Sequence, residues 1–187
     1  ATMAPHYNGA TWLWTGWIPQ AQITLIAGVS EVGKSWRAAA LITALTGARP
    51  LPDGTMVEHP GKVCLVETEE LRKAYIERLM AMGAPLDDIV MPMQGTDDPM
   101  FIPSVVDHMT EIRAATEASK AVAVVVDSLS AGHDKDENSA EMRGVMRILA
   151  QLAVSVNVPV IVVHHLRKRQ QYETDKVTLD RVRGSSS

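Results

Sequence analysis

The eight residues GVSEVGKS, at positions 28–35, constrain the fold more than any other part of the chain. They match the pattern GxxxxGK followed by Ser or Thr, and they lie between the apolar run ITLIA and a segment of helical character. Gly28 and Gly33 allow successive backbone N–H groups to turn inward, and the following helix adds the positive end of its dipole. A strand, this loop and a helix in that order predict a cradle for phosphate groups. A simple turn between strand and helix needs neither both glycines nor the Lys-Ser pair.

Side chains of this loop predict how a nucleotide is held. Lys34 is expected to contact the outer phosphates, and the hydroxyl of Ser35 is expected to bind Mg²⁺. Glu31 puts a negative charge in the loop, but its side chain can point outward because backbone N–H groups make the cradle. The candidate nucleotide-binding residues are Gly28, Val29, Ser30, Glu31, Val32, Gly33, Lys34, Ser35 and Trp36.

Hydrophobic periodicity predicts the rest of the architecture. Continuous apolar runs predict strands that are buried on both faces, at 23–28, 62–67, 121–127 and 159–165, with a weaker candidate at 88–92. Apolar stripes of helical period predict helices over 34–46, 69–82 and 139–156. Because strands and helices alternate, the predicted fold class is α/β, with a mostly parallel sheet flanked by helices on both faces.

The chain has the size and composition of one globular unit. Of its 187 residues, 46% are hydrophobic and 21% are charged, so it can bury a core of its own. We expect a single domain over residues 1–187, with an N-terminal segment 1–20 and a polar segment 165–187 that lacks a hydrophobic period. Because the sequence stops directly after that polar segment, we expect the C-terminal end of the core to be missing.

Cysteine usage and hydropathy favour a cytoplasmic protein. The lone Cys64 lies in the apolar run KVCLV, where a thiol is most simply a small buried hydrophobe. No segment approaches the roughly 18 uninterrupted apolar residues of a membrane helix, so we expect no contact with a membrane. The net charge of −4 does not by itself indicate a nucleic-acid-binding protein.

Two acidic residues at strand ends are candidates for the metal and for catalysis. Asp127 ends the run VAVVVD, where a carboxylate can hold the hydration shell of Mg²⁺ above the sheet. In a large branch of phosphate-loop ATPases, a strand inserted between the two motif strands supplies a glutamate that deprotonates the attacking water. The run KVCLV is such an insertion and leads to Glu69, although Glu69 and Glu70 also favour the start of a helix in any case.

The base of the nucleotide is inferred from missing motifs. GTP-specific switch proteins carry an Asn-Lys-x-Asp segment and a DxxG after the magnesium strand, whereas Asp127 is followed here by SLS. We therefore expect ATP and Mg²⁺ as the cofactors.

The motifs together resemble the RecA-like ATPase core of hexameric replicative helicases, and most of all the plasmid RepA-type helicases and related phage and mobile-element AAA-type ATPases. The resemblance covers nearly the whole chain and rests on the segments WLWTGWIPQAQITLIAG, GKSW, PLPDG, VEHPGKVCLVETEE, VVVDSLSAGHDKDEN, VIVVHHLRK and RVRGSS. It implies a ring-shaped homo-oligomer, a hexamer, that couples ATP hydrolysis to translocation on single-stranded DNA or to its unwinding. The runner-up interpretations are a recombinase- or regulator-type ATPase without unwinding, and a DNA-binding or loading module switched by ATP.

The resemblance also implies a strand order and a sensor. The strand PVIVVHH is expected between the phosphate-loop strand and the VVVD strand, so that His164 emerges beside the γ-phosphate and distinguishes ATP from ADP. His165 is expected to face the other way, because side chains alternate along a strand. A metal site at this pair is disfavoured because the two side chains diverge.

The polar segment is the candidate for contact with DNA. It carries six basic residues against three acidic ones, and in RecA-like rings it lines the central channel. A solvated loop of mixed charge is the alternative, and the last two arginines can instead serve as an arginine finger for a neighbouring subunit. The basic residues are Arg167, Lys168, Arg169, Lys176, Arg181 and Arg183. Trp12, Trp14 and Trp17 are expected to pack onto the domain rather than to stack on bases.

Overall fold

The computed structural model describes residues 11–29, 32–68, 72–92, 103–129 and 140–165. Its centre is a five-stranded parallel sheet in the order β3-β7-β6-β4-β5. The strands are β3 (Ile23–Gly28), β4 (Val63–Glu67), β5 (Ile89–Val90), β6 (Ala123–Asp127) and β7 (Val160–His165). All five coincide with predicted runs, and β7 lies between β3 and β6 as expected from the resemblance.

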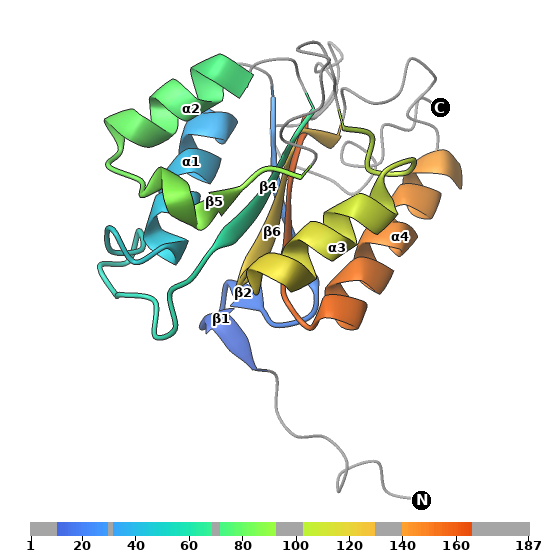
Figure 1. Ribbon diagram of the computed structural model, residues 1–187, viewed down its shortest axis with the longest axis horizontal. Helices are drawn as coiled ribbons and strands as arrows, with labels where there is room; N and C mark the ends of the chain where they lie inside the picture. Colours follow the sequence, from blue (N-terminus) through green and yellow to red (C-terminus); the bar gives the residue numbers. More distant parts are fainter. Residues whose placement is uncertain (1–10, 30–31, 69–71, 93–102, 130–139, 166–187) are drawn as a thin grey trace, which may run out of the picture.

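Helices cover both faces of the sheet (Figure 1). One face carries α1 (Lys34–Leu45) and α2 (Arg72–Ala81), which contact each other, and the other carries α3 (Met109–Ser119) and α4 (Ala140–Val156). The predicted α/β class with a helix layer on each side is therefore confirmed. A short 3-10 helix, η2 (Leu86–Asp88), leads into β5.

Helix α3 and a hairpin near the N-terminus were not predicted. Helix α3 buries only Ile112 and Thr116, so its sequence carries too narrow an apolar stripe to stand out. A two-stranded antiparallel hairpin, β1 (Trp12–Trp14) and β2 (Ile18–Pro19), lies at the end of the molecule opposite the carboxyl ends of the long strands (Figure 1). Its strands are too short to show a period.

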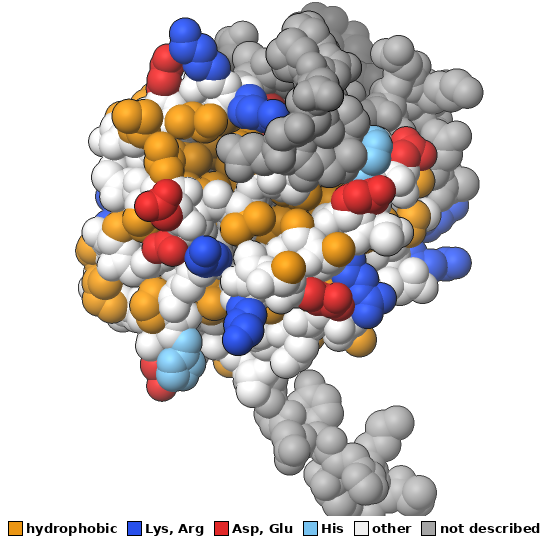
Figure 2. All heavy atoms as spheres, viewed as in Figure 1, with side chains coloured by type: hydrophobic (Ala, Val, Ile, Leu, Met, Phe, Trp, Pro, Cys, Tyr) orange, Lys and Arg blue, Asp and Glu red, His pale blue; other side chains and the backbone are white. Residues whose placement is uncertain are grey.

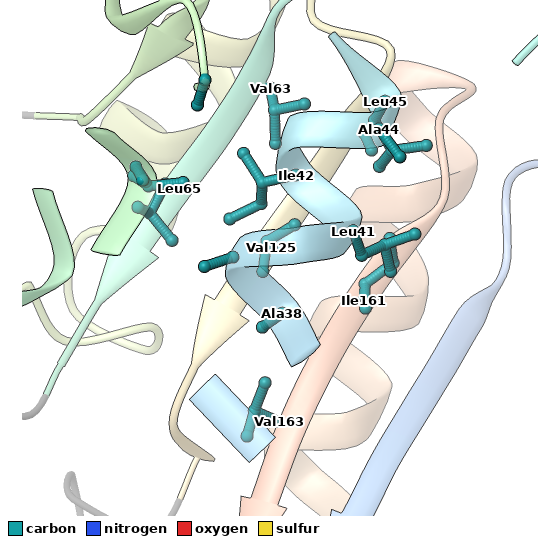
Figure 3. Packing of buried hydrophobic residues seen from close by; sticks show 14 of the residues in the cluster. Ala38, Leu41, Ile42, Ala44, Leu45, Val63, Leu65, Val125, Ile161 and Val163 are labelled. Carbon is teal, nitrogen blue, oxygen red and sulfur yellow. The ribbon is translucent and has the colours of Figure 1, made fainter. Parts of the chain in front are cut away.

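Helix α1 packs against the sheet through small and branched side chains, including Ala38, Ile42 and Leu45, which are fully buried (Figure 3). Thr46 caps the helix, and Gly47 follows in the left-handed conformation with φ of 82°. The end of α1 therefore agrees with the helix predicted over 34–46, because a glycine in this conformation commonly follows the last turn of a helix. Because α1 follows β3 in the chain after a short loop and contacts it, the start of the helix lies beside the end of that strand.

Each strand divides its side chains between two cores. In β6, Ala123 and Val125 belong to the core under α1 and α2, whereas Val124 and Val126 belong to the core under α3 and α4. Because side chains alternate along a strand, Asp127 continues the first set and lies on the α1 face. Cys64 is fully buried in the second core, and burial raises the pKa of its thiol to about 11. This agrees with its prediction as a small hydrophobe.

The tryptophans near the N-terminus behave differently from one another. Trp14 packs against the core and donates a hydrogen bond from Nε1 to Oδ2 of Asp53 at 2.7 Å. Trp17 stacks on Trp14 with ring centroids 5.4 Å apart, yet it is 65% exposed, and Trp12 is 43% exposed. Trp14 therefore packs onto the domain as expected, whereas much of the side-chain surface of Trp12 and Trp17 remains exposed. Among the described residues, no helix has the length and apolar character that a membrane span requires.

Candidate nucleotide-binding site

The loop between β3 and α1 has the backbone shape that phosphate binding requires. Gly33 precedes α1 in the left-handed conformation, with φ of 80°, which strains any residue other than glycine. At Gly28 an added Cβ would lie 3.2 Å from Cγ2 of Val32 and 3.5 Å from Cδ of Lys34, so the absence of a side chain lets the loop fold closely. The first turn of α1 has no acidic residue, which leaves its positive end available to an anion. Ser30 and Glu31 lie outside the described residues.

Lys34 is held beneath this loop. Its side chain is 5% exposed, and Nζ donates a hydrogen bond to the carbonyl oxygen of Val29 at 2.7 Å. An ammonium group binds anions through short, charge-assisted hydrogen bonds. The donor set of the loop therefore fits a phosphate group.

The two predicted metal ligands come together. The Ser35 hydroxyl donates to Oδ1 of Asp127 at 3.4 Å, and the Asp127 side chain is 3% exposed. Two neighbouring ligands of an octahedral Mg²⁺ ion, each at about 2.1 Å, lie about 3 Å apart. The hydroxyl and the carboxylate are thus of the right kind and close to the right separation for this ion.

A second carboxylate, Glu67, lies beside Asp127. The two residues are register partners on neighbouring strands β4 and β6, and Glu67 is 5% exposed. The residues that follow them are tied together as well, because the Thr68 hydroxyl donates to the Ser128 carbonyl and accepts from the Ser128 N–H at 3.0 Å. Thr68 N–H also donates to the Asp127 carbonyl oxygen at 2.9 Å. Sequence reasoning missed this support, although Glu67 ends its strand just as Asp127 does.

Comparison with known proteins agrees with this geometry. The AAA domain family (AAA_25) matches residues 8–171, which is most of the chain. The chain belongs to this family. Its fold is also similar to the crystal structure of the KaiC-like protein PH0186 from the hyperthermophilic archaeon Pyrococcus horikoshii OT3, with a TM-score of 0.56. The two share 19% sequence identity, over 83% of this chain and 72% of the other, which shows a common RecA-like fold alone. No curated protein sequence matches the chain.

The AAA domain holds its two histidines on opposite faces of β7, as predicted. Ile161 and Val163 belong to the core under α1, whereas Val160 and Val162 belong to the other core. Alternation therefore puts His165 on the face of Asp127 and puts His164, which is 2% exposed, on the α3 and α4 face. The divergence was expected, and the phase of the strand puts His165 rather than His164 on the face that carries Asp127.

Helix α2 brings further side chains to the edge of the site in this AAA domain. Tyr75, in its first turn, is 2% exposed, and the pKa of its phenol is raised well above the usual range by burial and then by the charge of Asp127. The Arg78 guanidinium lies 5.8 Å from the ring centre of Trp36 and 6.0 Å from that of Tyr75. Trp36 is 48% exposed directly after the predicted metal ligand Ser35. In the sequence, Tyr75 is one residue of the apolar stripe that predicts a helix over 69–82.

The remaining predicted residues fall outside the described part of the AAA domain. Glu69 is one of them, and so are the basic residues Arg167, Lys168, Arg169, Lys176, Arg181 and Arg183. On the face shown in Figure 2, acidic and basic side chains are interspersed among the described residues rather than gathered by sign. The described residues of that face therefore form no basic patch of the kind that DNA phosphates attract.

Proposed function

We propose that this AAA domain hydrolyses ATP with Mg²⁺ as its cofactor. The observation that carries the proposal is the Ser35 hydroxyl 3.4 Å from the Asp127 carboxylate, next to a glycine loop with a buried lysine. Ser35 and Asp127 would hold Mg²⁺ there, and the ion would neutralise negative charge on the phosphates. Lys34 exchanges the Val29 carbonyl for those oxygens, and the backbone N–H groups of the loop bind the remainder.

Hydrolysis needs a base for the attacking water, and we propose Glu69. Water attacks the γ-phosphorus while the bond to the bridging oxygen of ADP breaks, and the electron pair of that bond leaves with ADP. Glu69 orients the water and accepts its proton. The assignment is supported by the resemblance and by the end of β4 at Glu67, beside Asp127. We expect Glu69→Gln to bind ATP but to lose turnover. Full turnover in that variant contradicts the assignment.

For the sensor of the γ-phosphate we propose His165 in place of His164. The support is its place on the face of β7 that also carries Asp127 and α1. His165→Ala is expected to uncouple turnover from the nucleotide state, whereas His164→Ala changes a buried packing position.

The ATPase proposal is tested with two lysines that differ in position. Lys34 is buried under the loop, whereas Lys62 is exposed directly before β4. We expect Lys34→Ala to lower kcat/KM for ATP by about 100-fold or more, because a preorganised charge on the transferred phosphate is lost. Lys62→Ala is the control and should hydrolyse ATP at the wild-type rate. Equal rates for all three proteins contradict the proposal.

We further propose that the domain assembles as a ring, a hexamer, and acts on single-stranded DNA as a replicative helicase does. The proposal is supported by the RecA-like fold together with the basic residues between positions 167 and 183. Mass measurement with ATP and Mg²⁺, hydrolysis rates with and without single-stranded DNA, and an unwinding assay test it. Hydrolysis without stimulation or unwinding contradicts the helicase proposal and favours a regulator-type ATPase. DNA binding that depends on ATP, together with slow turnover, favours a loading module. Arg181→Ala and Arg183→Ala distinguish the two roles of these arginines: loss of DNA binding indicates a DNA contact, and loss of hydrolysis indicates an arginine finger.

A further inference from the structure

Tyr75 is a buried polar group on the metal side of the site, and the proposed ATPase function does not use it. Its side chain is 2% exposed, and its hydroxyl makes no hydrogen bond of ordinary length within the part of the chain that the structure describes, although the Asp127 carboxylate lies close enough to interact with it as an acceptor. A buried hydroxyl without a short hydrogen bond destabilises the folded protein. Its presence therefore calls for a role in a state that differs from the free protein.

The surroundings of the hydroxyl indicate that role. Tyr75 belongs to the core under α1 and α2, on the face of the sheet that carries Glu67 and Asp127. Both carboxylates raise the pKa of the phenol after the larger effect of burial, Asp127 more than Glu67, so both lie within electrostatic reach of it. A neutral phenol among carboxylates is a hydrogen-bond donor.

The ring of Tyr75 is also contacted by a basic side chain of the same helix. The Arg78 guanidinium, one turn later in α2, lies 6.0 Å from the centre of the Tyr75 ring and 5.8 Å from that of Trp36 in α1. This contact ties α2 to the helix that begins at Lys34. The hydroxyl is thus presented to the site by a braced side chain rather than by a loop.

We propose that the Tyr75 hydroxyl positions the Asp127 carboxylate for Mg²⁺. Ser35, from α1, already donates to Oδ1 of Asp127, and a carboxylate accepts several hydrogen bonds at once. A second donor from α2 fixes the rotation of the carboxylate, as outer-shell donors do for metal ligands elsewhere. This inference rests on the proposed Mg²⁺-dependent ATPase function, and Tyr75 is a positioning residue rather than a catalytic one.

Tyr75→Phe removes the hydroxyl and keeps the ring, and Thr24→Val is its matched control. The Thr24 hydroxyl is also buried without a hydrogen-bond partner in the described chain, but it lies near the start of β3, away from the phosphate loop. Thr24→Val therefore also removes a buried hydroxyl, but one that does not lie beside Glu67 and Asp127.

The experiment measures three quantities for the full chain: the midpoint of thermal unfolding without ligand, the affinity for a fluorescent non-hydrolysable ATP analogue in EDTA, and the Mg²⁺ concentration that half-saturates the complex with that analogue. For Tyr75→Phe we expect a midpoint no lower than wild type and unchanged affinity in EDTA. The Mg²⁺ requirement should rise about 10- to 100-fold. Thr24→Val should match wild type in its Mg²⁺ requirement.

The outcomes separate the two proposals. A wild-type protein that does not bind the analogue with Mg²⁺ refutes the ATPase proposal itself. If the wild type binds, a Tyr75→Phe variant with the wild-type Mg²⁺ requirement overturns the positioning role. A variant that loses stability or no longer folds shows that the hydroxyl is structural, and it overturns the inference as well. Equal loss of affinity with and without Mg²⁺ does the same, because it indicates a general defect of the pocket.

Discussion

Gly33→Ala isolates what the left-handed backbone of the phosphate loop contributes. An alanine Cβ at this position would meet no atom within 4 Å, so the substitution brings no clash. Its effect arises from φ of 80°, which costs a residue with a side chain about 1–2 kcal/mol. For a chain of this size each kcal/mol lowers the melting temperature by about 2–4 °C, so we expect a fall of about 2–8 °C.

Gly83→Ala is the matched control for this substitution. Gly83 follows α2 with φ of 77°, and an added Cβ there also meets nothing within 4 Å. The two variants should therefore lose a similar amount of stability. Only Gly33→Ala should weaken nucleotide binding, because relaxation of its backbone turns N–H groups away from the phosphates. Loss of one hydrogen bond to a charged group is worth about 1.5–3 kcal/mol, which corresponds to about a tenfold to 150-fold weaker affinity.

Calorimetry gives the melting temperatures, and titration with a fluorescent ATP analogue gives the affinities. The reasoning is refuted if Gly33→Ala loses stability as Gly83→Ala does but keeps wild-type affinity. The left-handed conformation would then serve only the turn into α1. If Gly83→Ala is destabilised but Gly33→Ala is as stable as the wild type, the argument that the left-handed backbone at Gly33 strains an alanine is wrong instead.

Three further predictions concern single residues. Cys64 should resist alkylation in the folded protein at pH 8 and react on unfolding, and fast labelling of the native protein contradicts this expectation. Because burial raises the pKa of the Cys64 thiol to about 11, its contribution to stability is present below the ordinary thiol pKa. That contribution is lost as pH rises through the folded pKa. Glu31→Gly should keep hydrolysis and alter nucleotide affinity or assembly, so that complete loss of hydrolysis refutes the outward-pointing side chain. Thr68→Val should lower the free energy of unfolding by about 1–3 kcal/mol in urea, because the Ser128 N–H and carbonyl lose a buried partner, and an unchanged urea midpoint opposes this.

The strands and the phosphate loop could be predicted because their signals are local. A strand buried on both faces is a continuous apolar run, and all five runs form the sheet. The glycines at 28 and 33 act through their own backbone, so the pattern alone identifies the conformation that Gly33 adopts. Helix α3 escaped prediction because it buries only Ile112 and Thr116, which leaves no clear apolar stripe in the sequence.

Tyr75 could not be recognised as part of the site for a different reason. In the sequence it is one member of an apolar stripe, and its ring does pack in the core. The hydroxyl matters only because the sheet order puts β4 and β6 side by side, which brings Glu67 and Asp127 together under α2. Such proximity depends on strands that are far apart in the chain, and no window of sequence contains it.

The choice between the two histidines shows the same limit in a sharper form. A strand that is apolar throughout has no polar face, so its sequence fixes the alternation of side chains but not which set faces which helix layer. The phase of β7 is set by its neighbours, through the pairs Ala27 with His164 and Gly28 with His165. Asp127 shares the α1 face with Ile161 and Val163, and His165 continues that set. Which of the two histidines lies on the face of Asp127 is thus decided by packing that only the folded sheet determines.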